Sequence, residues 1–459
     1  MTARVHRIQA GSRAVVVGAG ASGLSAARLL RLQGAAVTVL DRRDAATLGE
    51  RANEVRALGA DLALQREEAF DGVDTIVLSP GVPPLEAVRR AAAAGAEVMG
   101  EVELAARLLT GTLIGITGTN GKSTVTTLVG DMLRRSGVPT FVGGNLGLAL
   151  GHAVDSDADV AEGRVVAELS SFQLEEVSQL RPKVAALLNV SPDHLDRYDD
   201  LAHYARTKAR IFDAQRPDDH AVLPDGDADV RALFGERTDG PQLHLFGGDA
   251  GEVRVEGDRL VDQGSEFTLP VAELRLAGRH NQSNAAAAVL IARLAGARVD
   301  AMRDALVEAR GLSHRAERVR ELNGVQYIDD SKATNVGAAV AALDGLASPA
   351  RRAVLILGGV DKGGSYAPVV SRMSQVGRAV VVLGEASDLI TRAFDGAGLP
   401  LARAESIEEA VSLSAGLAQA GDLVLLAPAC SSFDMFRSYA HRGDAFQDAV
   451  RALPEGEAR

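Results

Sequence analysis

Short apolar runs that end in polar or glycine-rich turns alternate along the chain with stretches whose apolar residues recur at helical spacing. Residues 14–17 and 36–40 are rich in β-branched side chains and too short for a helix, which predicts two buried strands. The segment between them has leucine and alanine at helical spacing and stops at Gly34. Residues 75–78 repeat the strand pattern. Because strands that alternate with helices form parallel sheets, this part of the chain is predicted to be an α/β domain.

The middle of the chain carries the same alternation and then a segment richer in strands. An apolar run at residues 113–116 leads into a glycine-rich turn and a helical pattern, and further strands are predicted at 164–167 and 184–190. Residues 217–276 contain short strand-like runs separated by glycine and aspartate, and a strongly alanine-rich helix follows up to Ala295. A second α/β domain is therefore expected here.

Strands and helices alternate again after a boundary near residue 310. The predicted strands lie at residues 326–328, 353–357, 379–383 and 423–426, and each ends in a polar or glycine-rich turn. In open parallel sheets, ligands bind at the carboxyl ends of the strands. The sequence therefore predicts three α/β domains over residues 1–104, 105–309 and 310–459. The first and the last are expected to be Rossmann-like, and the middle one to be similar to P-loop ATPases.

Composition agrees with a globular protein of several domains. A chain of 459 residues with 46% hydrophobic and 24% charged residues is too long for one core. The net charge of −12 and the 3% aromatic content argue against nucleic acid as a partner. No apolar run approaches the ~18 residues of a membrane span, and the single cysteine excludes an intrachain disulfide. We expect a cytoplasmic protein without membrane insertion, and a monomer because no heptad pattern stands out.

The stretch from Ile114 to Thr124 is the clearest chemical signal in the sequence. It reads Ile-Gly-Ile-Thr-Gly-Thr-Asn-Gly-Lys-Ser-Thr, which places a strand, a glycine-rich turn and a helix start in the order typical of a phosphate-binding loop. Backbone N–H groups and the helix dipole would face the phosphates, Lys122 would add a positive charge, and the Ser123 or Thr124 hydroxyl could ligate Mg²⁺. Ile116 stands where the strict Walker pattern has glycine, so an ordinary turn with a solvated lysine is the alternative.

A second glycine-rich turn, Gly18-x-Gly20-x-x-Gly23, follows the first predicted strand, and Asp41 stands at the end of the next strand. This arrangement is the fingerprint of dinucleotide-binding proteins. Two alternatives remain open at this point. The first is a tight turn that binds no ligand. The second is a site for a nucleotide other than NAD, whose phosphate Arg42 and Arg43 could reach.

Three side chains of the middle domain suit a metal site but also have structural explanations. Glu168 ends a predicted strand, where a carboxylate would ligate a nucleotide-bound Mg²⁺ or cap a helix over residues 170–180. His194 lies in a Pro-Asp-His-Leu-Asp cluster, although a lone histidine is more often structural. Lys208 has the setting of a solvated lysine on a helix.

Polar turns also follow the predicted strands of the third domain. Residues 329–335 read Asp-Asp-Ser-Lys-Ala-Thr-Asn, and residues 358–364 form a glycine-rich turn whose lysine suits a substrate carboxylate. Cys430 is not expected to be a nucleophile, because no histidine flanks it closely. Three domains that each carry a ligand-type turn suggest three substrates: a nucleoside triphosphate, a nucleotide-like molecule and a small acid.

Taken together, these motifs resemble those of the Mur ligase family. The matching segments follow one another along essentially the whole chain, at residues 117–124, 168–173, 189–198, 278–284, 314–315, 329–335 and 358–363. Within the family, the N-terminal nucleotide-type turn and residues 330–335 and 428–434 are most similar to the members that add D-glutamate.

The resemblance implies an amide synthesis driven by ATP, with two Mg²⁺ ions. The alanyl carboxylate of UDP-N-acetylmuramoyl-L-alanine would attack the γ-phosphate of ATP, and the amine of D-glutamate would then attack the acyl phosphate. Lys122, His194 and Lys208 would be catalytic. Ser123 and Glu168 would hold one Mg²⁺. His194 and Lys208 would hold the other, with Lys208 carbamylated so that it offers an anionic oxygen.

The resemblance also implies three sets of binding residues. ATP would contact Gly118, Thr119, Asn120, Gly121, Lys122, Ser123, Thr124, Asn281, Asn284, Arg315 and Asp330. The uridine nucleotide, on the domain at 1–104, would contact Gly20, Ala21, Ser22, Asp41, Arg42, Arg43, Gly81 and Asn145. D-Glutamate, on the domain at 310–459, would contact Lys332, Thr334, Lys362, Ser432, Phe433 and Tyr439. Two positions depart from the family pattern, because Arg42 replaces a small hydroxyl residue and Tyr439 replaces phenylalanine.

Three other functions compete with this interpretation. A nicotinamide-dependent oxidoreductase would explain the turn at residues 18–23 and leave Lys122 without a role. A nucleotide-gated binding protein would form no amide product. A ligase of the same family with a different amino-acid substrate would share every motif of the phosphate loop.

Overall fold

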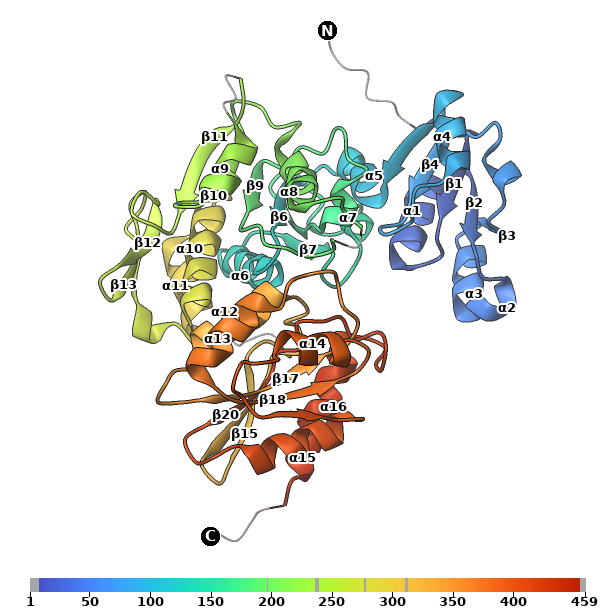
Figure 1. Cartoon of the computed structure of the whole chain (residues 1–459). Helices are drawn as coiled ribbons and strands as arrows, with labels where there is room; N and C mark the ends of the chain where they lie inside the picture. The colour runs from blue at the N-terminus through green and yellow to red at the C-terminus, as the bar shows by residue number, and fades with distance from the viewer. Residues whose placement is uncertain (1–7, 196, 236–238, 276–277, 310–312, 455–459) are drawn as a thin grey trace.

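Three sheets follow one another along the chain in the computed structural model (Figure 1), which describes residues 8–195, 197–235, 239–275, 278–309 and 313–454. The first sheet has five strands, the second nine and the third six. Their strands fall within residues 13–100, 112–270 and 317–426 respectively. The three predicted α/β domains are therefore present, while their boundaries at 104 and 309 stay predictions.

The N-terminal sheet is entirely parallel, with the strand order β3-β2-β1-β4-β5. Its strands are β1 (Arg13–Val17), β2 (Ala36–Asp41), β3 (Asp61–Leu64), β4 (Thr75–Leu78) and β5 (Glu97–Gly100). Its helices are α1 (Ala21–Leu32), α2 (Ala45–Leu48), α3 (Glu50–Ala57) and α4 (Glu86–Ala93). The order reverses between β1 and β4, which puts the glycine-rich turn after β1 at the switch point where open sheets bind ligands.

The central sheet has the order β14-β13-β12-β11-β10-β9-β6-β8-β7, and its described strand pairs are parallel except β12 with β13 and β13 with β14. Its strands are β6 (Thr112–Thr117), β7 (Thr140–Gly144), β8 (Arg164–Glu168), β9 (Val184–Leu187), β10 (His220–Pro224), β11 (Gln242–Phe246), β12 (Val253–Glu256), β13 (Arg259–Asp262) and β14 (Thr268–Pro270). The associated helices are α5 (Glu101–Leu108), α6 (Lys122–Arg135), α7 (Ser171–Leu174), α8 (Leu201–Ala209), α9 (Ala228–Phe234), α10 (Arg279–Leu294) and α11 (Val299–Glu308).

The helix expected over residues 170–180 is wrong, because α7 ends after one turn at Leu174. The backbone beyond it is held by side chains instead of by helical hydrogen bonds. Glu103 accepts the N–H groups of residues 178, 179 and 180, and Arg210 donates to the carbonyls of Glu175 and Val177. These contacts satisfy backbone groups that a longer helix would have paired internally.

The C-terminal sheet has the order β15-β16-β20-β17-β18-β19, in which only β15 is antiparallel to its neighbour. Its strands are β15 (Glu317–Leu322), β16 (Val325–Asp329), β17 (Ala353–Gly358), β18 (Gly377–Leu383), β19 (Leu401–Arg403) and β20 (Leu423–Leu426). Its helices are α12 (Val336–Leu346), α13 (Ala367–Val376), α14 (Ser387–Ala393), α15 (Ile407–Leu417) and α16 (Tyr439–Ala452).

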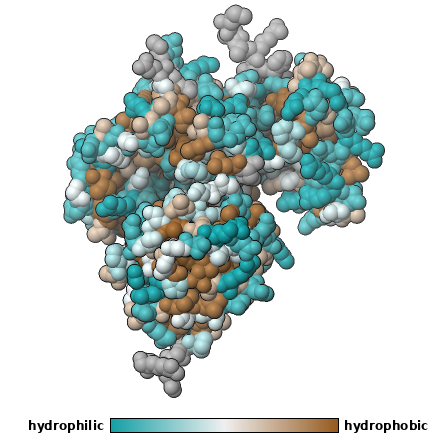
Figure 2. Space-filling model, in the orientation of Figure 1, coloured by the Kyte–Doolittle hydropathy of each residue, from teal (hydrophilic) through white to brown (hydrophobic). Residues whose placement is uncertain are grey.

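The hydrophobic cores divide the molecule differently from the sheets. One cluster of buried side chains runs from the N-terminal sheet through α1 and α5 to one face of the central sheet. A second covers the other face of the central sheet, under α6, α10 and α11. The two large clusters of the C-terminal domain contain only residues of that domain. In Figure 2 the C-terminal domain lies against the central domain, and a notch separates it from the N-terminal domain.

Within the residues that the structure describes, none of the helices combines the length and the apolar character needed to cross a bilayer.

Candidate active site

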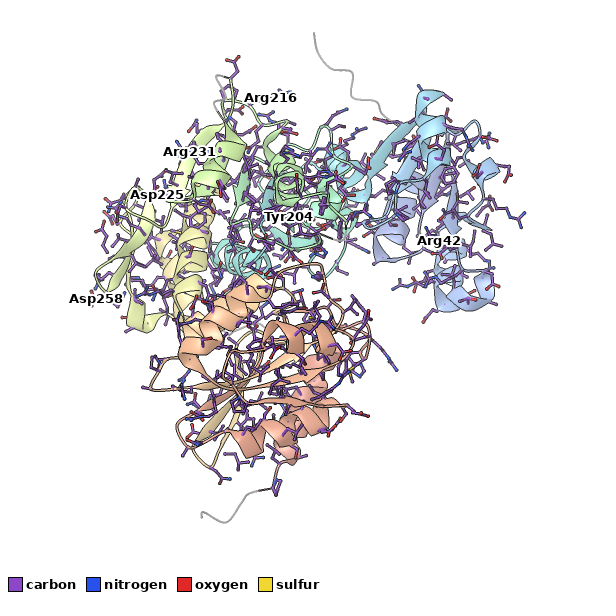
Figure 3. All side chains as sticks on the ribbon, in the orientation of Figure 1. Arg42, Tyr204, Arg216, Asp225, Arg231 and Asp258 are labelled. Atoms are coloured by element: carbon purple, nitrogen blue, oxygen red, sulfur yellow. The ribbon has the colours of Figure 1, made fainter. Side chains whose placement is uncertain are left out.

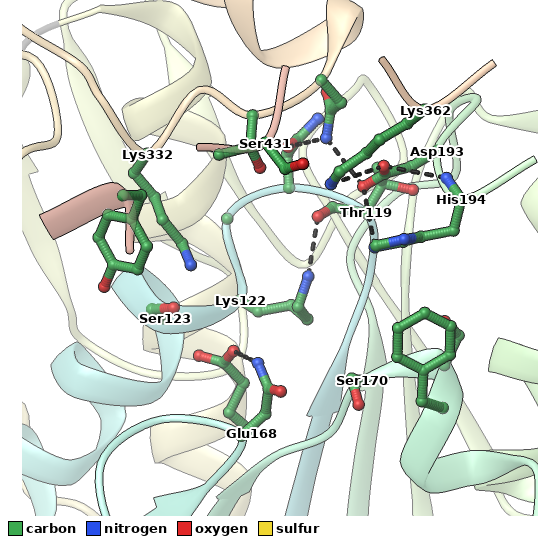
Figure 4. A pocket seen from close by; sticks show the side chains of 18 of the residues that line it. Thr119, Lys122, Ser123, Glu168, Ser170, Asp193, His194, Lys332, Lys362 and Ser431 are labelled. Carbon is green, nitrogen blue, oxygen red and sulfur yellow. Dashed lines mark hydrogen bonds and ion pairs between the residues drawn. The ribbon is translucent and has the colours of Figure 1, made fainter. Parts of the chain in front are cut away.

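A cavity of about 580 Å³ lies where the central and C-terminal domains meet (Figure 4). The central domain contributes the turn after β6, the end of β8 and the loop that holds Asp193 and His194. The C-terminal domain contributes the turns after β16, β17 and β20. The carboxyl ends of parallel strands from two sheets therefore face one another across a single space, which is where such sheets bind ligands.

The predicted phosphate loop forms the floor of this cavity, between β6 and α6. Gly118 and Gly121 have φ angles of 152° and 84°, which L-residues with side chains rarely adopt. A Cβ at Gly121 would also lie 2.3 Å from Oδ1 of Asn284, so the Asn284 side chain would have to move to admit any other residue. Lys122 folds back over the loop and donates to the carbonyls of Gly118 and Thr119, at 2.8 Å each. Desolvation lowers the pKa of Lys122.

Glu168, at the end of β8, is buried at the edge of the cavity. Its Oε1 accepts a hydrogen bond from Nδ2 of Asn145 at 2.6 Å, whereas its buried Oε2 has no hydrogen-bond partner among the described residues. Burial acts to raise the pKa of Glu168, but Lys122 and hydrogen bonds from Ser123 and Asn145 outweigh it and lower the pKa. The alternative role as a helix cap is wrong, because Ser170 caps α7. A buried carboxylate oxygen beside the Ser123 hydroxyl matches the hard oxygen ligands that Mg²⁺ prefers.

Lys208 is not the solvated helix lysine that its sequence setting favours. Its side chain is only 1% exposed, and Nζ donates to the carbonyl of Gly118 at 2.9 Å while lying 4.6 Å from the centre of the Tyr204 ring. Desolvation, together with the charge of Lys122, places its pKa well below the ordinary value. Lys208 therefore lies directly behind the phosphate loop.

His194 and its neighbour Asp193 line the cavity from the opposite side of the central domain. His194 has a φ angle of 55°, the left-handed conformation that is unusual for a residue other than glycine. Asp193 contacts the C-terminal domain, because Oδ1 lies 3.1 Å from Nζ of Lys362 and Oδ2 accepts from Nδ2 of Asn335 at 3.1 Å. Burial acts to raise the pKa of Asp193, but Lys362 and His194 hold it low. Sequence reasoning missed Asp193 and Asn335, although both lie inside the polar runs that it identified.

The C-terminal wall of the cavity is rich in cations. Burial lowers the pKa of Arg315, which precedes β15, and lowers that of Lys332, after β16, to about 8. Nζ of Lys332 lies 4.0 Å from the centre of the Tyr439 ring. Four further predicted residues line the same wall, of which Phe433 is 74% exposed: Thr334, Lys362, Ser432 and Phe433.

Some of the predicted ATP residues lie beside the cavity without lining it. Asn284, at the start of α10, packs against Gly121 and donates to Oδ1 of Asn281 at 3.2 Å. Asp330 follows β16, and burial raises its pKa to about 7. Gly118 and Thr124 flank the loop residues that do line the cavity, which are Thr119, Asn120, Gly121, Lys122 and Ser123.

The predicted uridine residues form a separate group at the switch point of the N-terminal sheet. Gly20, Ala21 and Ser22 begin α1, and Gly81 follows β4 in a turn that lines a small cleft against the central domain. Asp41 is already engaged, because it accepts from the N–H of Ala19 and pairs with Arg43, which holds its pKa well below the ordinary range. Arg42 is exposed on the N-terminal domain, whereas Tyr204 lies in the central domain (Figure 3). Asn145 is the member of this set that lines the main cavity.

Comparisons with known proteins cover nearly the whole chain. Three family models match: "Mur ligase MurD-like, N-terminal domain" over residues 12–100, "Mur ligase middle domain" over 116–292 and "Mur ligase, glutamate ligase domain" over 314–430. Relatives from Desulfosudis oleivorans and Myxococcus xanthus, each named UDP-N-acetylmuramoylalanine–D-glutamate ligase, are 44% and 43% identical. The alignments span 97% of this chain and of the first relative, and 96% of this chain and 99% of the second.

Solved structures share the fold at lower identity. A pseudomurein peptide ligase type C from Methanothermus fervidus is 18% identical, with a TM-score of 0.62 over 97% of this chain and 100% of that one. UDP-N-acetylmuramate-alanine ligase from Thermotoga maritima is 19% identical, with a TM-score of 0.59 over 96% and 99%. With these likenesses in fold and the high identity of the full-length relatives, the chain belongs to the Mur ligase family.

Proposed function

We propose that this protein is an ATP-dependent ligase that joins D-glutamate to UDP-N-acetylmuramoyl-L-alanine, a step of peptidoglycan precursor synthesis in the cytoplasm. The relatives that are more than 40% identical over nearly the full length carry the name of this activity. The observation that carries the mechanism is the shared cavity, in which a phosphate loop faces a wall of cations from a second domain.

The first chemical step suits the charges around the phosphate loop. The alanyl carboxylate attacks the γ-phosphorus of ATP. A bond forms between the carboxylate oxygen and this phosphorus, and the bond between the phosphorus and the oxygen that leaves with ADP breaks. Attack of one anion on another requires that negative charge be neutralised, and Lys122, Arg315 and Lys332 all line the cavity. The loop N–H groups and the start of α6 orient the phosphates.

The second step forms the amide. The uncharged amine of D-glutamate attacks the carbonyl carbon of the acyl phosphate, and the C–O bond to phosphate breaks as phosphate leaves. An acyl phosphate is lost to water unless the site is enclosed, so a cavity between two domains that come together suits this chemistry. Lys332 and Lys362, with the Thr334 and Ser432 hydroxyls nearby, offer cations and donors for the two carboxylates of a dicarboxylic amino acid.

The cavity residues also fit Mg²⁺. The unpartnered Oε2 of Glu168 and the hydroxyl of Ser123 would hold one ion, and His194 with Lys208 would hold a second. When bound, such ions supply charge neutralisation at the transferring phosphoryl group. Asn145 fixes the Glu168 carboxylate by its hydrogen bond and leaves the other oxygen available.

For Lys208 to contribute a ligand oxygen, its amine must be converted to a carbamate. Carbon dioxide adds to an uncharged amine: a bond forms between Nζ and the carbon, and a proton leaves. The low pKa of the buried Lys208 favours the uncharged amine, and the positive charge of Lys122 would stabilise the resulting anion.

The test is phosphate release from ATP and Mg²⁺ in the presence of UDP-N-acetylmuramoyl-L-alanine, with D-glutamate compared against L-glutamate and other amino acids. Release that depends on D-glutamate, with an amide product of matching mass, is the expected result. Release with another amino acid would keep the family and change the substrate. No release with any amino acid would instead favour an oxidoreductase or a nucleotide-gated binding protein.

A further inference from the structure

A single arginine connects the N-terminal domain to the loop that carries His194. Arg197 lies at the small cleft between the N-terminal and central domains, where residues 78–82 face α7 and the start of α5. Its Nη2 donates to the backbone carbonyl of Val82 at 3.2 Å. Val82 closes the turn that contains Gly81, because its N–H donates to the carbonyl of Ser79. Arg197 therefore holds the substrate-side turn after β4 against the central domain.

The guanidinium is itself fixed by a carboxylate. Nε of Arg197 lies 2.9 Å from Oε1 of Glu175, and Nη2 lies 2.5 Å from Oε2, which is the two-pronged geometry that orients arginine most strictly. The hydroxyl of Tyr198 donates to the same Oε1 at 2.7 Å. Because both side chains of the pair are mostly buried, the interaction is screened little by solvent.

The same cluster also contacts the His194 ring. The guanidinium carbon of Arg197 lies 5.1 Å from the centre of the Phe172 ring, and the edge-on contact between Phe172 and His194 has a centroid distance of 4.8 Å. The Tyr198 ring also stacks with Phe172, at a centroid distance of 6.2 Å and nearly parallel to it. The His194 ring is therefore held on one side by an aromatic group that Arg197 and Glu175 keep in place.

The backbone reinforces this arrangement. The N–H groups of Arg197 and Tyr198 both donate to the carbonyl of His194, at 3.0 and 3.2 Å. This turn stabilises the left-handed conformation of His194, which costs energy for a residue with a Cβ. Figure 4 shows the His194 side chain beside Asp193 at the rim of the cavity.

From these contacts we infer that Arg197 is a positioning residue, which orients His194 in the cavity and docks the turn at residues 79–82 in register with it. The inference rests on the proposed function, in which the uridine substrate extends from the N-terminal domain to the phosphate loop, in the cavity that His194 also lines. A substrate that spans two domains reacts only when both ends are aligned, and Arg197 contacts both the turn on one side and the His194 loop on the other.

Arg197→Ala, Arg197→Lys and Glu175→Gln test this role, with Arg181→Ala as the matched control. Arg181 makes a comparable two-pronged pair with Asp219, at 2.6 and 3.1 Å, in the same domain but away from the main cavity. We expect Arg197→Ala to raise the KM for the uridine substrate by about ten- to a hundredfold and to lower kcat, while the KM for ATP stays within about twofold. Arg197→Lys should restore part of the loss, and Arg181→Ala should behave like the wild type.

A second measurement does not depend on turnover. With ¹³C-labelled histidine, the His194 ring resonance is assigned by its disappearance in His194→Gln, and its shift reports the ring current of Phe172. Arg197→Ala should move this resonance, and Arg181→Ala should not. An unmoved resonance, or equal increases of the KM for ATP and for the uridine substrate, would overturn the inference. If the wild type shows no turnover with D-glutamate, the proposed function fails, and the resonance still decides whether Arg197 positions His194.

Discussion

Nζ of Lys362 lies 3.1 Å from Oδ1 of Asp193, and this ion pair joins the C-terminal domain to the central domain across the cavity. Lys362 is one of the cations predicted to bind D-glutamate. Because its side chain is only 16% exposed and pairs with a carboxylate, an incoming substrate carboxylate meets a lysine that is already oriented. We therefore expect binding of the amino acid and the approach of the two domains to be linked.

Lys362→Ala should weaken D-glutamate binding more than ATP binding. We expect the KM for D-glutamate to rise by about tenfold or more, because a charge-assisted contact is lost, while the KM for ATP changes little. Steady-state phosphate release measures both values. Lys362→Arg keeps the charge and should recover part of the affinity. An unchanged KM for D-glutamate in Lys362→Ala would remove this residue from the amino-acid site.

Lys122→Ala should abolish turnover and leave the uridine substrate bound. The lysine lies in the phosphate loop, whereas the predicted uridine residues, except Asn145, lie on the N-terminal domain. We expect kcat to fall by about a thousandfold or more, because charge at the transferring phosphoryl group is no longer neutralised. Phosphate release gives the loss, and calorimetry with the uridine substrate gives the retained binding. Turnover at the wild-type rate would contradict the phosphate-loop assignment.

Lys208→Ala should be inactive, and a short carboxylate such as acetate should rescue part of the activity. The added carboxylate would occupy the place of the carbamate oxygens next to Lys122 and His194. Intact-protein mass spectrometry should show an adduct on the wild type that disappears on acidification. A carbamate adds the mass of one carbon dioxide to the chain, and Lys183→Ala, which removes a partly exposed lysine of the same domain, serves as the control. If acetate stimulates the wild type as strongly as it stimulates Lys208→Ala, the result would count against the carbamate.

The affinity for D-glutamate should decline above about pH 8. Burial lowers the pKa of Lys332 to about 8, so its ammonium is charged below this pH and loses its proton above it. The KM for D-glutamate should therefore rise between pH 8 and pH 9. In Lys332→Arg the guanidinium keeps its charge, so the rise should be smaller. Because the amine of D-glutamate titrates equally with both enzymes, the ratio of the wild-type KM to the Lys332→Arg KM isolates the effect of Lys332. A ratio that does not change with pH would contradict the prediction.

The sequence predicted the strands that are buried on both faces. β4 and β20 have the predicted bounds, because continuous apolar runs between helices leave little choice. β15 was not predicted, because this antiparallel edge strand is mostly charged and its two apolar residues, Val319 and Leu322, do not give the alternation typical of a strand. β3 was not predicted for a similar reason, because three of the four side chains of this edge strand are exposed and the fourth is only partly buried.

The candidate site could be predicted where a motif is local and not where it depends on domain arrangement. The loop around Lys122 and the carboxylate Glu168 follow strands of one sheet, and their proximity follows from strand order. The contact between Asp193 and Lys362 spans 169 residues and two sheets, so no local pattern contains it. The burial of Lys208 was missed because its contact with the Gly118 carbonyl spans 90 residues, although Tyr204 lies one turn earlier on the same helix.

The separation of the hydrophobic cores has a consequence for how the molecule comes apart. Since the N-terminal and central domains share one buried cluster, whereas the described C-terminal clusters stand alone, heating should melt the chain in two calorimetric transitions. Polar contacts such as those of Asn335 tie the two parts at the cavity. We therefore expect the C-terminal part to separate from the central domain as an intact body when the product leaves, without unfolding of either part. A compound that holds the two walls of the cavity together should therefore block product release after the amide has formed.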